Sequence, residues 1–299
     1  DHRDLHSFPT RRSSDLAADG EFDENIIFKI SDEDIEIIKE NLNKTKVLNL
    51  VQLVAVEYLY DEIKKENLDK DYETYLTMSN LKSIDLTKDV VTMLSVIQII
   101  NKQEFEENIE NQLFSFDDAT VTEVVDKVAE IQWLEYLLPI GLNFLLNNEE
   151  VQELMATYNI DEDTINKPSP EQLIEDFKNI KNVYKTIKDL GINNLEEAKN
   201  IFDSENLMAL EDEQIENMVD VVFNFELIDS NKGLIAAYIH NTLEQEETLQ
   251  GLINKEKFIE NFDKQEVKYI ALLGKILIEN DILSDNFDLT LFLTTENID

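Results

Sequence analysis

Few side chains in this sequence can carry catalytic chemistry, and their spacing matches no familiar active site. The chain contains no cysteine, which excludes thiol nucleophiles, disulfides and thiolate metal sites. Its three histidines are His2, His6 and His240. His240 follows Tyr238 and Ile239 on an apolar helical pattern and has no other histidine near it. We therefore expect His240 to be structural or solvated, because neither a zinc site nor a base–nucleophile pair can be assembled around it.

Carboxylates are the one abundant reactive group, since the chain has 65 Asp and Glu residues. Pairs one helical turn apart, such as Asp32 with Glu36 and Glu149 with Glu153, have the residue types of a two-carboxylate hydrolase. With so many acids, such pairs arise by chance and are typical of a solvated helix face. We predict no catalytic residue, no cofactor-binding residue and no enzymatic activity. A carboxylate-based hydrolase is the least favoured alternative.

Metal-binding patterns are incomplete. The segment from Asp69 through Asp71 to Glu73 places oxygen ligands at alternate positions, but it lacks the turn glycine and the distal glutamate of a calcium loop. We expect no dedicated metal site, only weak binding of divalent cations to the acidic surface. Trp133, the sole tryptophan, occupies an apolar position of the helical pattern, and we expect it to pack in the core.

The charge of the chain limits its partners. The formal net charge is −39, a sign that repels nucleic-acid phosphates and anionic membrane surfaces. The longest apolar stretches, residues 134–146 and 269–278, are shorter than the roughly 20 residues of a membrane span. We expect no nucleic-acid binding and no membrane insertion within this chain. Another protein or a cell-surface component is the expected partner.

Helical periodicity dominates the sequence, and it recurs over long intervals. Apolar residues follow one another at spacings of three and four, as in Val90, Leu94, Ile97 and Ile100. Residues 27–59 also align without gaps with residues 113–145 and 207–239, at offsets of 86 and 94. Twelve of these 33 columns are apolar in all three copies, against roughly two or three expected by chance. Five of the twelve apolar columns are Ile35/Val121/Ile215, Val47/Trp133/Leu227, Val54/Ile140/Leu234, Val56/Leu142/Ala236 and Tyr58/Phe144/Tyr238.

Helix start signals support the same alignment. Ser31 and Asp117 are good N-caps that occupy equivalent positions, whereas Glu211 is a poor one, so we expect Asp212 to cap the third copy. Pro170 suits the first turn of a helix, while Pro139 lies inside an apolar helical pattern and is expected to bend or divide that helix.

The predicted fold is all-α, an elongated helical-repeat array whose units of about 83–94 residues contain three to four helices each. We place a partial unit at residues 17–82, full units at residues 83–167 and 168–262, and a partial unit at residues 263–299. The apolar faces of the two partial units are expected to lack neighbours.

Two parts of the chain resemble known sequences. Residues 1–16 contain all three arginines, Arg3, Arg11 and Arg12, and resemble the translation of a sequencing-library adapter, so we treat them as non-native. The segments Ile30-Ser-Asp-Glu-Asp-Ile35 and Trp133-Leu-Glu-Tyr-Leu-Leu-Pro139 resemble the acidic, cysteine-free helical-repeat surface proteins of low-GC Gram-positive bacteria and mollicutes. That resemblance implies a secreted or wall-attached protein with no transferable catalytic residues.

We therefore expect a non-enzymatic segment of a larger bacterial cell-surface protein, acting as a stalk or as a protein-interaction array. Its expected location is extracellular or in the cell wall. An intracellular helical-repeat scaffold in the cytoplasm is the alternative. An exposed apolar groove would favour a binding role over a purely mechanical one.

Overall fold

The computed structural model describes residues 30–102, 114–192, 194, 197, 209–244, 251 and 253–279. Every regular element in these residues is helical, with 13 α-helices, one 3₁₀ helix at Glu162–Thr164 and no strand. The all-α prediction is confirmed for this part of the chain. The adapter-like residues 1–16 and residues 280–299 of the expected last partial unit lie outside it.

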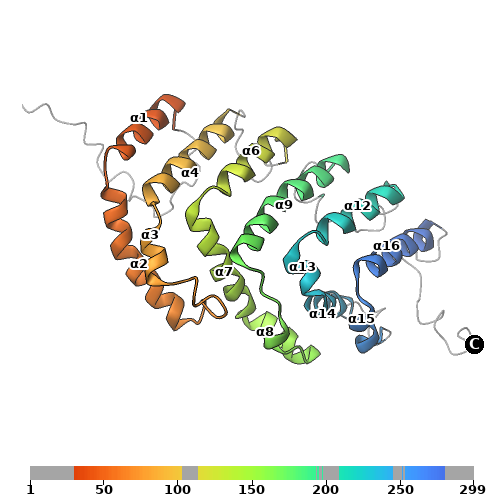
Figure 1. Ribbon diagram of the computed structural model, residues 1–299. Coiled ribbons are helices and arrows are strands. Elements are labelled where there is room, and N and C mark those ends of the chain that lie inside the picture. The colour runs from red at the N-terminus through yellow and green to blue at the C-terminus, as the bar shows by residue number, and fades with distance from the viewer. Residues whose placement is uncertain are drawn as a thin grey trace, which may run out of the picture.

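Six helices stand side by side in one curved row, the upper row in Figure 1. Each packs on the next, although long stretches of sequence separate them. In order, they are α1 (Asp32–Asn43), α4 (Leu86–Asn101), α6 (Asp118–Val128), α9 (Pro170–Asp189), α12 (Asp212–Val222) and α16 (Lys264–Glu279). We call this the first row.

The remaining helices form a second row along the lower side of the same arc (Figure 1). Within it, α3 packs on α2, α8 on α7 and α15 on α14, and α14 also contacts α8. Its members are α2 (Val47–Lys65), α3 (Met78–Ser83), α7 (Gln132–Leu146), α8 (Glu149–Tyr158), α13 (Glu226–Ser230), α14 (Lys232–Leu243) and α15 (Lys255–Asn261). The molecule is thus two helices deep and longer than it is thick.

Local capping explains where the first-row helices begin. The side chains of Ser31 and Asp117 accept hydrogen bonds from backbone N–H groups three residues later, as predicted. Ser169 and Gln172 form a capping box with Pro170 in the first turn of α9. The prediction for α12 was wrong: Asp212 is the first helical residue and Glu211 is the N-cap. Its backbone N–H donates to Gln214 Oε1 at 2.8 Å, and this bond makes the poor cap acceptable.

The core follows the apolar columns of the alignment. Two columns are buried in all three copies: Ile35/Val121/Ile215 in the first row and Val56/Leu142/Ala236 in the second, each residue at most 9% exposed. Val121 and Ile215 pack among other first-row residues, whereas Leu142 packs with Leu173 of α9 and Ala236 with Val219 of α12. Burial of these apolar side chains supplies hydrophobic stabilisation within the first row and between the two rows.

Pro139 does not divide its helix, since α7 runs without interruption from Gln132 to Leu146 with the buried Pro139 inside it. The expectation of a divided helix was therefore wrong. Proline removes one backbone donor, but packing against α9 and α8 holds α7 in place. The predicted local bend remains a prediction.

Candidate functional site, an apolar groove

An open apolar groove of about 510 Å³ lies between α7, α9 and α13. Its lining is almost entirely hydrocarbon and includes one carboxylate, that of Asp176. The lining residues are Leu137, Leu138, Gly141, Leu142, Phe144, Leu145, Leu173, Asp176, Phe177, Ile180, Phe225, Leu227 and Ile228. We call this site the α7–α9 groove.

Four large apolar side chains at the groove remain open to solvent. Phe144 and Leu145 on α7 are 64% and 61% exposed, Leu137 is 47% exposed, and Ile180 on α9 is 43% exposed. Gly141 adds space between them, since a Cβ placed on it would meet no atom within 4 Å. A contiguous exposed apolar surface of this kind is typical of a binding site rather than of a solvated helix face.

Asp176 is held in place by the helix next to it and is not available as a catalytic acid. Its two carboxylate oxygens accept hydrogen bonds from the backbone N–H groups of Glu226 and Leu227, at 2.8 and 3.0 Å. These are the first two residues of α13, whose N–H groups have no partner within the helix. A buried carboxylate at this end also complements the helix dipole. Asp176 therefore fixes α13 against α9 and shapes the groove.

The same arrangement occurs one period earlier in the chain. Asp89 on α4 accepts from the N–H groups of Gln132 and Trp133, both at 2.9 Å, and these residues begin α7. The two aspartates are 87 positions apart. The apolar spacing by itself matches Val91, Leu94, Ile97 and Ile100 of α4 with Ile174, Phe177, Ile180 and Val183 of α9, at an offset of 83. The two registers differ by about one helical turn, a slip that a 3.6-residue period cannot detect.

Exposed apolar residues also recur on α2 and α4 at the matching positions. Val51 and Tyr58 on α2, 86 positions before Leu137 and Phe144, are 57% and 73% exposed. Met93, 87 positions before Ile180, is 51% exposed. The open apolar surface of the α7–α9 groove thus has a counterpart on the preceding pair of helices.

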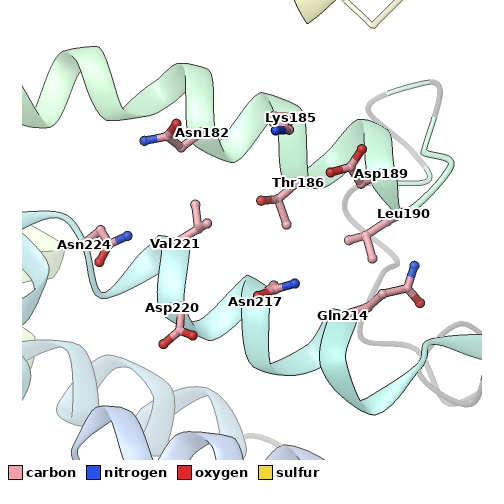
Figure 2. Close-up of a pocket in the computed structure, with 10 residues that line it drawn as sticks. All are labelled: Asn182, Lys185, Thr186, Asp189, Leu190, Gln214, Asn217, Asp220, Val221 and Asn224. Carbon is pink, nitrogen blue, oxygen red and sulfur yellow. The ribbon is translucent and has the colours of Figure 1, made fainter.

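A second cleft, of about 270 Å³, lies between α9 and α12 and is lined mainly by polar side chains. In Figure 2, Thr186 of α9 and Val221 of α12 point toward the opposing helix, whereas Asp220 lies on the far side of α12. There Asp220 pairs with Lys264 at 2.7 Å and Lys268 at 2.9 Å, and these hydrogen-bonded lysines lower its pKa. A carboxylate held ionised in this way is a poor general acid near neutral pH.

His240 is structural, as predicted. It is 3% exposed, and its Nε2 lies 3.0 Å from the carbonyl oxygen of Ile253. Since a carbonyl can only accept, we assign the ring proton to Nε2, which leaves Nδ1 to accept from the Tyr158 hydroxyl at 2.8 Å. His240 thus ties α14 to α8 and to the segment before α15.

The residues of the calcium-like pattern are engaged with lysines. Asp69 is buried and paired with Lys64, and Asp71 pairs with Lys167 at 2.7 Å. No group of three or more His, Cys, Asp or Glu side chains suited to a metal ion occurs within the described residues. Weak divalent binding stays a prediction.

Trp133 packs as predicted, half-buried against a cluster formed by Val56, Ile63, Leu81 and Ile84. The groove, by contrast, was not anticipated from the sequence. One signal pointed to it: the aromatic column Tyr58/Phe144/Tyr238, whose members are 73%, 64% and 64% exposed. An aromatic that recurs at an exposed position is better explained by binding than by packing.

In the described part of the chain, no helix is both long and apolar enough to span a membrane. Compared with protein-family models, with curated proteins and with solved structures, the chain matches none.

Proposed function

We propose that the chain is a helical-repeat array in which each unit adds one stretch of binding surface. Two observations support the repeat. The columns Ile35/Val121/Ile215 and Val56/Leu142/Ala236 are buried in every copy. Asp89 and Asp176 make the same pair of bonds to the start of the following second-row helix. Solenoid proteins stack units through such repeated neighbour contacts and present extended binding surfaces.

The array binds another protein and is not an enzyme. The observation that carries this proposal is the α7–α9 groove, with Leu137, Phe144 and Ile180 open to solvent around an apolar floor. Hydrogen bonds lower the pKa of three described carboxylates, those of Glu36, Asp117 and Asp220. A hydrolase needs the opposite, an acid whose pKa is raised.

The occupant of the groove is an amphipathic helix with an apolar face and a basic opposite face. The apolar face fits because apolar anchors at helical spacing fill grooves of this kind between helices. The basic face follows from the net charge of −39, which attracts cationic partners and repels acidic ones.

A labelled synthetic peptide tests this proposal. A leucine–lysine peptide with helical spacing is titrated against the chain by fluorescence anisotropy, with a scrambled peptide of equal charge as the first control. Phe144→Asp should weaken binding at least about tenfold because it places a charge in the apolar site. Ile37→Asp, an equal charge change at a 50% exposed position on α1, should leave the affinity nearly unchanged. Equal binding of both peptides, or equal affinity of the two variants, would refute the groove as the site.

We further propose that this array belongs to a larger bacterial cell-surface protein, located outside the cell or in its wall. The resemblance of its segments at residues 30–35 and 133–139 to such surface proteins supports that location. A cytoplasmic scaffold is the alternative, and extension of the open reading frame in both directions distinguishes them: an export signal upstream supports the surface protein, and its absence from the complete frame supports the scaffold.

A further inference from the structure

An apolar cavity of about 260 Å³ lies between the two rows, where α12 and α16 of the first row meet α13 and α14 of the second. Its lining includes Ile215 and Val219 of α12, Ile235 and Ile239 of α14, and Ala271 of α16. Every residue that lines it is apolar, and no polar atom contributes to its surface. We call this site the α12–α16 cavity.

A repeated ion pair shows which residues of α9 and α16 are equivalent. Lys181 of α9 pairs with Asp126 of α6 at 2.8 Å, and Lys268 of α16 pairs with Asp220 of α12 at 2.9 Å. Asp126 and Asp220 are themselves equivalent, at the offset of 94 that relates the second copy to the third. The two lysines are 87 positions apart, the same offset that relates the capping aspartates of α4 and α9. Residues of α9 therefore correspond to residues of α16 at an offset of 87.

Around α6, two aromatic side chains of α9 fill the space between the helices. Phe177 and Tyr184 pack against the cluster of Phe116, Val121 and Val125 at α6. The Tyr184 hydroxyl also donates a hydrogen bond to the Phe116 carbonyl at 2.5 Å. The Tyr184 ring is thus fixed between α9 and α6.

Around α12, neither ring is present. At the offset of 87, Ala271 stands in the place of Tyr184, and Lys264 stands in the place of Phe177. Lys264 does not fill the space with its end group, because its ammonium pairs with Asp220 at 2.7 Å. The apolar residues of α12 that would face the rings are kept and line the cavity. Replacement of large side chains by smaller ones opposite a retained apolar surface accounts for the cavity.

The size and lining of the cavity define what it can hold. An apolar cavity of about 150 Å³ stays dry and binds benzene, and the α12–α16 cavity is larger. Water would find no hydrogen-bond partner in it, and a charged group would lose its hydration without compensation. An uncharged apolar ring meets neither cost and gains the burial of its own surface.

We propose that the α12–α16 cavity binds a small, uncharged molecule with an apolar ring, in the place that the Tyr184 ring takes around α6. The bound molecule joins α16 to α12 as Tyr184 joins α9 to α6. The site is independent of peptide binding, because Ile228 is the only residue that it shares with the lining of the α7–α9 groove.

Isothermal titration calorimetry of the full chain with toluene tests the proposal. We expect one toluene molecule per chain and no binding of benzoate, whose carboxylate would have no partner in the lining. Ala271→Phe places a ring in the cavity and should weaken toluene binding at least about tenfold. Gln265→Phe adds the same ring at an exposed position of α16 and should bind toluene like the unmodified chain. Circular dichroism checks that both variants keep their helix content.

Methyl NMR of the unmodified chain locates the bound toluene without any substitution. The signals of Ile235 and Ile239 should shift, whereas those of Leu145 and Ile180 at the groove should stay in place. Absence of toluene binding up to its solubility limit, including the case in which another part of the chain fills the cavity, would overturn the proposal. So would undiminished binding by Ala271→Phe, benzoate binding as tight as that of toluene, or shifts confined to the groove.

Discussion

At the scale of single residues, the side chains that matter most in this molecule are those that satisfy a helix end belonging to another part of the chain. Asp89 is 1% exposed and Asp176 is 8% exposed, and each accepts two backbone N–H bonds across the interface. Neither was predictable, because a carboxylate on a helix is usually exposed to solvent and the partners of these two are more than 40 positions away. Long-range capping leaves no local sequence pattern.

Removal of such a carboxylate should lower the free energy of unfolding. In Asp176→Ala, the N–H groups of Glu226 and Leu227 lose their acceptors inside the interface, and the free energy of unfolding should fall by about 2–3 kcal/mol. Asp89→Ala should lose a similar amount. Urea denaturation measures both, with Asp61→Ala, an exposed change on α2, as control. If Asp176→Ala were no less stable than the control, its capping role would be disproved.

The buried Tyr72 predicts that the free energy of unfolding falls at high pH. Tyr72 is 5% exposed and donates a hydrogen bond to the Pro168 carbonyl at 2.7 Å, and burial raises its pKa to about 12 from an ordinary value near 10. The folded chain thus holds this proton more tightly than the unfolded chain. The associated stability, about 2.7 kcal/mol, is complete below pH 10 and is lost as the pH rises through 12.

Chemical denaturation between pH 9 and pH 11.5 measures this loss. Tyr72→Phe should show a shallower fall of stability over that range than the unmodified chain, because the phenylalanine has no proton to lose. Tyr238→Phe removes a tyrosine that is 64% exposed and should keep the original slope. Identical slopes in all three proteins would contradict the assignment.

At the scale of elements, apolar spacing predicted helices well and predicted their packing only in part. The columns Ile35/Val121/Ile215 and Tyr58/Phe144/Tyr238 look alike in the sequence, yet the first is buried and the second is exposed. Periodicity identifies an apolar face but not which flank of that face meets a neighbour. The groove lies on the flank that stays open, and it takes residues from α7, α9 and α13, which only the fold brings together.

A larger side chain at Gly141 on α7 can fill the groove without removing any contact between the helices that form it. Gly141→Leu replaces a mid-helix glycine where a Cβ has open space, so helix stability should rise by about 0.5–1 kcal/mol while the new side chain occupies the groove. Peptide affinity should fall at least about tenfold. Gly233→Leu on α14 should raise helix stability by a similar amount at a position away from the groove, and it should leave peptide affinity unchanged. A Gly141→Leu variant that binds like the unmodified chain would exclude the groove.

At the scale of the whole molecule, the described helices stand in two curved rows (Figure 1). The all-α class was predictable from composition and periodicity, whereas the curvature and the juxtaposition of α7 with α9 depend on contacts distant in sequence. We propose that this arrangement lets the molecule bind a partner along its length.

The central claim, that the α7–α9 groove is a protein-binding site, is tested most directly by methyl NMR of the isotopically labelled chain during titration with the leucine–lysine peptide. The account predicts that the methyl signals of Leu137, Leu145 and Ile180 shift in proportion to bound peptide, while those of Ile37 and Ile38 on α1 stay in place. Shifts confined to α1, or shifts spread evenly over the acidic surface, would contradict it.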